Sequence, residues 1–300
     1  MPPKSANAKK ELLQIEDKLT KYMLFAKLTR EKLEELADAI YMAALRSGLP
    51  LQEAIKAIRS STVLNSRFFE TKSGSIFIFI KPRYRDFARR IFLKRAGGGT
   101  PNAAMGKAEL LLMLFSDKTE KPASGDILYG KREIEIKTNG GKVGLGNGME
   151  ANKAVVAHCK KLGVTLRKSK AGKAAKGQPM FDPTSAEDRK ALGRNLSSTL
   201  GVWWQAVSGE MMSKPTWPKV RRTFLERVAS EQLAAPHAEL LVIAKNGKFR
   251  FFKNKSDFVN YYNNDMTRYE YRGYQKNPFS LYLDVLHVKP KKATAKRSKS

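Results

Sequence analysis

The sequence contains very little cysteine and histidine. Its single cysteine, Cys159, excludes an internal disulfide and a cysteine-rich zinc site, and is typical of a protein in a reducing compartment. The three histidines, His158, His237 and His287, lack the spacing of a metal site and have no nucleophile partner. Zinc chemistry and histidine-assisted nucleophilic catalysis are therefore not expected.

Long hydrophobic runs are lacking too. The most apolar stretches, LLLMLF and SIFIFI, are much shorter than the roughly 18 residues that span a bilayer. The opening MPPKSANAKKELL lacks the apolar segment of a secretory signal. We expect a protein that is soluble, not secreted and not bound to membranes. Its expected location is the cytoplasm, or the host-cell cytoplasm if its source is viral.

Acidic residues are scarce relative to basic ones. Only 28 Asp and Glu stand against 57 Lys and Arg, which gives a net charge of +29. Such an excess destabilises a compact chain by self-repulsion unless a polyanion binds. DNA carries a negative charge about every 1.7 Å, and neutralising its phosphates releases counterions. DNA is therefore the expected partner, and RNA stays open as an alternative.

The basic residues concentrate in three segments. No acid lies between Glu150 and Asp182, where RKSKAGKAAKGQP predicts a basic loop at 160–180. The tail at 289–300 predicts a disordered basic arm. Residues 81–95 interleave aromatic residues with seven bases and predict an amphipathic helix whose apolar side chains face inward.

The chain divides into two parts joined by a glycine-rich linker. Residues 1–95 predict a mainly helical region, with a β-hairpin in STVLNSRFFETKSGSIFIFIK around the turn KSGS. The linker is AGGGTPNAAMG at 96–106. Residues 107–288 mix helical and strand patterns, including the hairpin LLVIAKNGKFRFF, whose Asn246-Gly247 suits a type I′ turn.

The stretch GDILYGKREIEIKT, residues 125–138, predicts a hairpin with three ionised side chains on one face. A two-residue type II′ turn at Gly130-Lys131 places Asp126 directly opposite Glu135. Opposed residues share a face of the sheet, and strand alternation adds Lys137 to that face. The spacing therefore brings two carboxylates and an ammonium group together.

Two interpretations of this face stay open from the spacing alone. Opposed carboxylates about 4 Å apart repel by about 4 kcal/mol at an effective dielectric of about 20. A divalent cation reverses this penalty, because carboxylate oxygens are the ligands that Mg²⁺ prefers. Lys137 offers the structural alternative, since its charge partly neutralises the pair without a metal.

Gly125-Asp126, an eight-residue gap and Glu135-Ile136-Lys137 together resemble the active-site hairpin of the PD-(D/E)xK, or restriction-endonuclease-like, nuclease superfamily. Glycine stands at 125 where the family name has proline, a substitution that the superfamily often shows. The resemblance implies an α/β fold. It would have a restriction-endonuclease-like core at 107–288, with a mixed β-sheet flanked by helices, preceded by the mainly helical N-terminal region.

The resemblance also implies a function, the Mg²⁺-dependent hydrolysis of DNA phosphodiester bonds to leave a 5′-phosphate and a 3′-hydroxyl. Mn²⁺ would substitute for Mg²⁺. Asp126, Glu135 and the Ile136 carbonyl would hold the metal. Lys137 would orient or deprotonate the attacking water. Cutting both strands would favour a homodimer.

The superfamily commonly takes a further acid from its first core helix. Glu109 matches that position in the apolar segment GKAELLLMLF. An unpaired carboxylate on an apolar helix is costly, unless it lies exposed or at the helix start. By the resemblance, Glu109 would reach the metal through water or help to hold a second ion.

The glycine-rich stretch TNGGKVGLGNG is either a loop that lets the backbone approach DNA or an ordinary flexible loop. It lacks the P-loop pattern, and Met149 occupies the place of the third glycine of G-x-G-x-x-G. From this stretch and the basic loop, contacts with DNA are expected at Asn139, Lys142, Lys160, Lys161, Arg167, Lys168 and Lys170.

Two functions from other classes stay open. One is a non-catalytic nucleic-acid-binding or DNA-packaging protein on the same fold. The other is an architectural basic protein, in which the hairpin is structural and binding depends on salt alone.

Overall fold

The computed structural model describes residues 6–22, 25, 28–94, 107–122, 126–138, 141–168, 177–234, 239–244, 246–271 and 276–285. The α-helices are α1 (Ala6–Thr20), α3 (Arg30–Ser47), α4 (Leu51–Ala57), α5 (Arg67–Glu70), α6 (Arg85–Lys94), α7 (Lys107–Phe115), α8 (Gly148–Lys161), α9 (Ala186–Leu192), α10 (Leu196–Ser208), α11 (Trp217–Gln232) and α12 (Lys255–Tyr262). Short 3₁₀ helices are η1 (Ile76–Ile78), η2 (Pro82–Tyr84) and η3 (Gly193–Asn195).

The strands form two sheets. They are β1 (Ser73–Ser75), β2 (Thr119–Glu120), β3 (Ile127–Tyr129), β4 (Arg132–Thr138), β5 (Gly141–Asn147), β6 (Glu239–Ile243), β7 (Lys248–Phe252), β8 (Tyr269–Tyr271) and β9 (Lys276–Leu283). The larger sheet has the order β1-β7-β6-β4-β3-β2, with β4 and β6 parallel and the other pairs antiparallel. The smaller sheet has the order β5-β9-β8. The predicted α/β class with a mixed sheet is confirmed.

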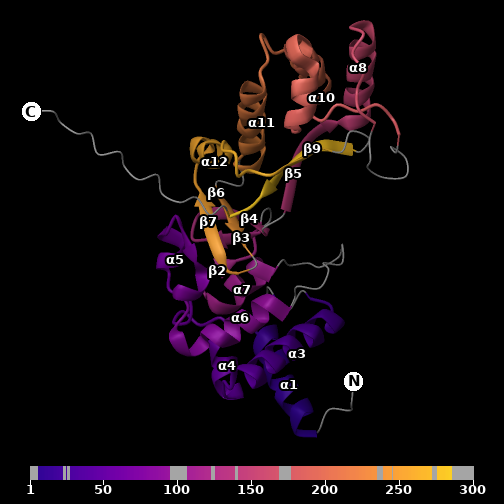
Figure 1. The fold of residues 1–300 in the computed structure, drawn as a ribbon. Helices are drawn as coiled ribbons and strands as arrows, with labels where there is room; N and C mark the ends of the chain where they lie inside the picture. The colour runs from indigo at the N-terminus through magenta and orange to yellow at the C-terminus, as the bar shows by residue number, and fades with distance from the viewer. Residues whose placement is uncertain are drawn as a thin grey trace, which may run out of the picture.

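The six-stranded sheet lies in the middle of the molecule. Figure 1 shows helices α1, α3, α4 and α6 below it, and helices α8, α10 and α11 above it around β5 and β9. β1, which comes from the first ninety-five residues, pairs with β7. The N-terminal region therefore contributes an edge strand to the sheet.

The two faces of the large sheet are covered by two hydrophobic cores. Strand β6 shows why, because its side chains alternate between the faces. Leu241 and Ile243 join the first core, formed with α1, α3, α4, α6 and α7. Leu240 and Val242 join the second core, formed with α8, α10, α11 and α12. A strand buried on both faces reads as a continuous apolar run, as ELLVI does.

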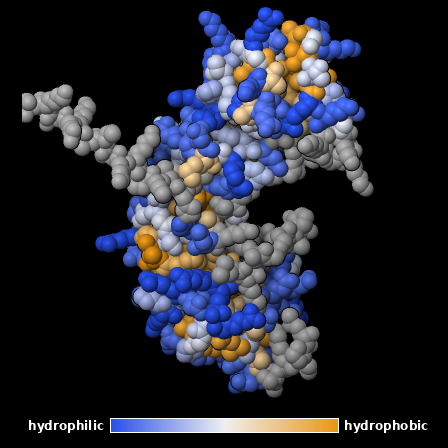
Figure 2. All heavy atoms as spheres, viewed as in Figure 1, coloured by the Kyte–Doolittle hydropathy of each residue, from blue (hydrophilic) through white to orange (hydrophobic). Residues whose placement is uncertain are grey.

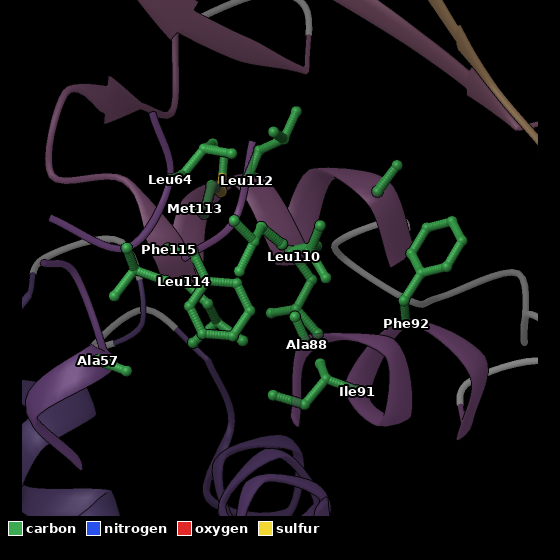
Figure 3. Close-up of a cluster of buried hydrophobic side chains, with 14 of the residues drawn as sticks. Ala57, Leu64, Ala88, Ile91, Phe92, Leu110, Leu112, Met113, Leu114 and Phe115 are labelled. Carbon is green, nitrogen blue, oxygen red and sulfur yellow. The ribbon is translucent and has the colours of Figure 1, made fainter. Parts of the chain in front are cut away.

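Helix α7 is the most apolar helix of the first core. Its residues from Leu110 to Phe115 are all buried, which explains why LLLMLF shows no amphipathic pattern. Figure 3 shows most of these side chains, from Leu110 and from Leu112 to Phe115, in one cluster with Ala88 and Ile91 of α6 and Ala57 of α4. This packing fixes the helix that carries Glu109 at its start.

The segment 61–81 differs from the β-hairpin predicted for it. Only its ends pair, through an isolated antiparallel bridge between Leu64 and Ile80. Between them the chain forms α5, β1 and η1. Phe68 and Phe69 of α5 are buried. Phe68 packs at a tilt against the ring of Phe249, and Phe69 stacks on the ring of Tyr129. Burial of this aromatic pair in the first core overrides the strand propensity, so the hairpin prediction is wrong.

The amphipathic helix predicted at 81–95 is confirmed for its described part. It consists of η2 followed by α6, and Phe87, Ile91 and Phe92 all face inward. Arg83 and Arg89 lie over the rings of Tyr84 and Phe77. The arginine face of the helix therefore lies partly on aromatic rings.

The hairpin of β6 and β7 is confirmed, but its predicted type I′ turn is wrong. The Ala244 N–H donates to the Lys248 carbonyl at 2.7 Å, and the Gly247 N–H donates to the Ala244 carbonyl at 2.8 Å. The connection between the strands at 244–247 is therefore longer than a two-residue turn. Gly247 has a φ of +80°, whereas Asn246 does not have the positive φ that a type I′ turn requires.

The glycine-rich stretch after β4 forms a strand, β5, where a loop was predicted. It pairs with β9 over nearly its whole length, with a bulge between Leu145 and Asn147. A Cβ added at Gly144 would lie 2.6 Å from the Phe279 carbonyl oxygen and 2.7 Å from the Ser280 Oγ. The glycine thus permits a close approach of two strands.

We expect Gly144→Ala to lower the free energy of unfolding by about 2 kcal/mol, because a Cβ at this position must displace backbone. The control is Gly201→Ala in α10, where the nearest atom to an added Cβ is 3.4 Å away. In a helix interior, a change from glycine to alanine raises the free energy of unfolding by up to about 1 kcal/mol. Urea unfolding of both variants measures the difference. Equal stabilities would contradict the close approach of β5 and β9.

Candidate active site

Strands β3 and β4 form the hairpin that the sequence predicts. Tyr129 pairs with Arg132, and Ile127 pairs with Ile134. Gly130 has a φ of +62°, the value that a type II′ turn requires at its first central residue. The predicted register is confirmed, and it determines which side chains of β3 and β4 share a face.

Asp126 lies at the start of β3, one step beyond the last paired residues. Its Oδ2 accepts the Ile136 N–H at 2.6 Å, so the carboxylate is held against β4. Burial raises the pKa of Asp126, and the charge of Glu135 raises it further. The Ile136 N–H bond and the charges of Lys137 and Lys121 act in the opposite direction. The site thus holds a carboxylate whose ionised form is destabilised.

Glu135 and Lys137 lie on one face of β4, as strand alternation predicts. The Lys137 Nζ forms an ion pair with the Glu135 Oε1. In the parallel register their neighbours on β6 are Leu240 and Val242, which belong to the second core. The Glu135 and Lys137 side chains are only half-buried, so at these two residues this face of β4 is partly exposed to solvent.

Glu109 comes to the site from the other side of the sheet. Helix α7 packs in the first core with Ile134 and Ile136, whose side chains point away from the Glu135 face. Glu109 is buried, with 5% of its surface exposed, and its Oε1 accepts the Lys121 Nζ at 2.6 Å. In the structure the Glu109 carboxylate therefore pairs with a lysine. The metal-binding role predicted for Glu109 stays a prediction.

Lys121 is the residue of the site that the sequence did not reveal. Its Nζ reaches the Glu109 carboxylate and also donates to the Asp126 carbonyl at 3.3 Å. The only signal in the sequence is a lysine five residues before Asp126, one base among 57. Its ammonium group therefore links helix α7 to the residue just before β3.

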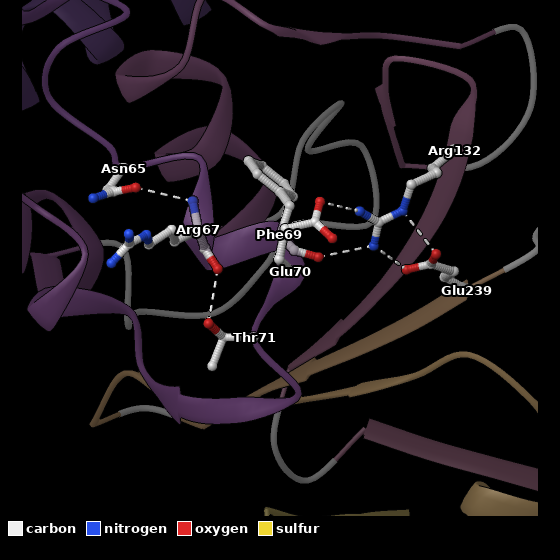
Figure 4. A network of polar contacts seen from close by, with 7 residues as sticks. All are labelled: Asn65, Arg67, Phe69, Glu70, Thr71, Arg132 and Glu239. Atoms are coloured by element: carbon white, nitrogen blue, oxygen red, sulfur yellow. Dashed lines mark hydrogen bonds and ion pairs between the residues drawn. The ribbon is translucent and has the colours of Figure 1, made fainter.

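An arginine–carboxylate cluster lies at the other end of β4. Arg132 makes two bonds to Glu239 of β6, at 2.7 and 2.5 Å, in a bidentate arrangement. It also donates to the Phe69 carbonyl at 2.9 Å and to Glu70 at 3.2 Å, which joins α5 to the sheet (Figure 4). This contact adds a side-chain link at one end of the parallel pairing between β4 and β6, the ladder in which Glu135 lies.

The residues predicted to contact DNA are only partly brought together. Asn139 and Lys170 lie outside the described residues, and of Lys142 the backbone alone is described, in β5. Arg167 bonds to Asp188 at 2.5 Å and pairs with Asp182 at 3.7 Å. It holds the start of the basic loop to α9. The remaining exposed bases of the set are Lys160, Lys161 and Lys168.

The residues present suit a hard divalent cation. In an antiparallel pair the N–H and C=O of one residue point to the same neighbour, so the Ile136 carbonyl lies on the Asp126 side. With Asp126 and Glu135 it supplies oxygen ligands of the kind that Mg²⁺ prefers. Among the described residues, no group of three His, Cys, Asp or Glu side chains is arranged to hold a metal. The fit therefore rests on two carboxylates and one carbonyl.

Comparison with protein-family models, with curated proteins and with solved structures found no match. In the part of the chain that the structure describes, no helix is long and apolar enough to cross a membrane.

Asp126→Asn is expected to stabilise the protein at pH 7. The pKa of Asp126 is raised above its ordinary value of 3.8 in the folded state, so the folded protein binds this proton more tightly than the unfolded chain. Protonated Asp126 therefore contributes to stability below pH 3.8, and this contribution is lost as the pH rises through the pKa of the folded protein. Asparagine keeps the acceptor for Ile136 without the charge. Thermal unfolding between pH 3 and 8 measures this, and a lower melting temperature for the variant at pH 7 would contradict it.

Proposed function

We propose that this protein is a metal-dependent DNA endonuclease whose active site is centred on Asp126, Glu135 and Lys137. The observation that carries the proposal is the register of β3 and β4. It brings two carboxylates and one ammonium group to one place on the sheet, with the Asp126 carboxylate on the Ile136 N–H. A hairpin chosen for stability alone would avoid two carboxylates this close.

Asp126, Glu135 and the Ile136 carbonyl would hold Mg²⁺, or Mn²⁺ in its place. When bound, the ion would act as a Lewis acid on the scissile phosphate and supply hydroxide near neutral pH. It would also relieve the unfavourable ionisation of Asp126, whose pKa burial and Glu135 raise.

Lys137 would orient the attacking water through its ammonium group, or would take the proton of that water when it is present as the neutral amine. Its ammonium group contacts Glu135 and is about one third exposed, so it lies where water reaches the site. Lys121 would keep Glu109 and the start of β3 together, which holds Asp126 in place. In-line attack would leave a 5′-phosphate and a 3′-hydroxyl.

The charge of the molecule supports DNA as the substrate. The net charge of +29 favours a polyanion. Figure 2 shows that hydrophilic residues cover much of the coloured surface in this view. Cutting both strands would favour a homodimer with two sites.

A non-catalytic nucleic-acid-binding or DNA-packaging protein is the second candidate. The observation that favours it is the ion pair between Glu135 and Lys137, since it neutralises one carboxylate without a metal. Such a protein would bind DNA with the same salt dependence and would leave it uncut.

The test is incubation of the protein with supercoiled plasmid in Mg²⁺, in Mn²⁺ and in EDTA. We expect nicked or linear DNA with either metal and intact plasmid in EDTA, with ends that DNA ligase can rejoin. Linear, single-stranded and branched DNA serve as further substrates. If none of them is cut with any metal while DNA binding weakens steeply with salt, the second candidate replaces the nuclease.

A further inference from the structure

A pocket of about 460 Å³ lies in the N-terminal region, apart from the candidate active site. Its walls are the segments 61–66 and 78–82, with Arg85 of α6. This volume is within the range of small-ligand sites in proteins, roughly 300–1,000 Å³. The segment that forms it belongs to the region whose predicted hairpin was wrong, so nothing in the sequence pattern anticipates it.

The pocket is built on a fixed frame. The Lys81 N–H donates to the Val63 carbonyl at 3.0 Å, and the Asn65 N–H donates to the Phe79 carbonyl at 2.8 Å. These bonds tie the two walls to each other, while the Leu64 N–H donates to the Phe115 carbonyl of α7. The walls are therefore held by main-chain bonds that do not depend on an occupant.

The polar lining is suited to an anion. The lining contains no Asp or Glu, and two of its residues, Lys81 and Arg85, are basic. Arg85 donates through Nε to the Ile80 carbonyl at 2.9 Å, which aligns the group. Within the described residues, Lys81 forms no ion pair. The hydroxyl of Ser66 and the amide of Asn65 add neutral donors at the rim.

One side of the pocket is apolar. Ile78 has 62% of its surface exposed, which is unusual for a large aliphatic side chain. Phe79 beside it is half-buried and held edge-on against Phe68 and Phe249, with ring centroids 5.9 and 6.0 Å apart. Ile78 and Phe79 both line the pocket, so they offer apolar surface to a ligand there.

We infer that this pocket binds one nucleotide unit of a single-stranded nucleic acid. Lys81 and Arg85 receive its phosphate, and Ile78 with Phe79 receives its base. Stacking of a base on an aromatic side chain together with a cationic track for the backbone is the usual basis of single-strand binding. A free nucleotide shares this chemistry, and the test separates the two sources. The site is a binding site only, so it stands whether or not the hairpin cuts DNA.

The test measures binding of a fluorescein-labelled 12-nucleotide single-stranded DNA by anisotropy in EDTA, so that cleavage plays no part. Lys81→Glu is expected to raise the Kd at least about tenfold, because it removes a phosphate contact and adds repulsion. Ile78→Ser, which leaves the charge unchanged, is expected to raise it about threefold or more. Both side chains are exposed, so both variants should fold as the wild type does.

The matched control is Lys190→Glu on α9, an exposed lysine with the same charge change. It should weaken binding no more than about twofold, by long-range charge alone. Equal losses for both lysine variants, with no loss for Ile78→Ser, would overturn the site. Calorimetry with dAMP distinguishes the two ligands. If dAMP binds and its binding depends on Lys81, the pocket is a site for free nucleotides. If only the oligonucleotide binds, the pocket is a site for a single strand.

Discussion

Replacing Arg59 by alanine is expected to lower the free energy of unfolding by about 4 kcal/mol. This is less than the sum of its charge-assisted bonds, worth about 1.5–3 kcal/mol each, because the chain relaxes and water reaches some of the carbonyls. The guanidinium donates to the Ser116 carbonyl at 2.7 Å, the Asp117 carbonyl at 3.0 Å and the Thr119 carbonyl at 2.5 Å. It also reaches the Met113 carbonyl at 3.3 Å. One side chain thus satisfies carbonyls at and beyond the end of α7.

The Arg59 guanidinium caps the C-terminal end of α7. This cap is important because α7 has an apolar surface and no basic residue in its last turn. A cation at the C-terminal end of a helix is favoured by the helix dipole, and buried carbonyls without a donor are costly. Thr119 begins β2, the edge strand beside β3. The loss of Arg59 would therefore disturb both elements that position Glu109 and Lys121.

Arg59→Gly is the informative comparison. Arg59 has a φ of +57°, a conformation that costs a residue with a Cβ about 1 kcal/mol or more. The glycine variant loses the same bonds but relieves this strain, so it should be about 1 kcal/mol more stable than the alanine variant. Chemical denaturation measures both, with Arg46→Ala on exposed helix surface as the control. A loss below about 1 kcal/mol for Arg59→Ala would mean that the cap is unimportant.

Lys137→Met is expected to lower plasmid cleavage by about 10²–10⁴-fold, the range for loss of a general acid–base group. Methionine keeps most of the aliphatic side chain but cannot receive a proton from water. DNA binding should stay within about twofold of the wild type, since one charge among many contributes little. Cleavage rates at saturating DNA, with anisotropy for binding, measure the two effects separately.

The control for this variant is Lys190→Met, which removes one exposed positive charge away from the hairpin. It should cut at the wild-type rate. If Lys137 is only the structural counter-ion of Glu135, Lys137→Met would lower stability, because Glu135 loses its ion pair, and would leave any cleavage unchanged.

The sequence predicted the hairpin of the site because its determinants are local. Glycine at 130 sets the turn, and a period of two then fixes which side chains share a face. The contact of Lys121 with Glu109 depends on how α7 and β2 return to the sheet, which no local pattern encodes. The prediction therefore found the opposed carboxylates and missed the lysine beside them.

The errors in the fold have the same origin. The stretch at 139–149 was expected to form a loop because glycine weakens a strand, yet Gly144 is needed for the close approach of β9. The segment 61–81 has strand-forming residues, but burial of Phe68 and Phe69 gives it a different path. The role of Arg59 depends on carbonyls more than fifty positions away. In the two segments, tertiary contact overrides a local preference. For Arg59, the partners are too distant in the sequence for a local pattern to indicate them.

The most direct test of the proposed active site compares the wild type with Glu135→Gln on supercoiled plasmid in Mg²⁺, at concentrations that give equal DNA occupancy. Glu187→Gln, an exposed acid of α9, is the control. We predict that the wild type and the control nick the plasmid, that EDTA stops both, and that Glu135→Gln retains about one hundredth of the rate or less. Cleavage by Glu135→Gln at the wild-type rate, or cleavage by the wild type in EDTA, would contradict a metal-dependent site at this hairpin.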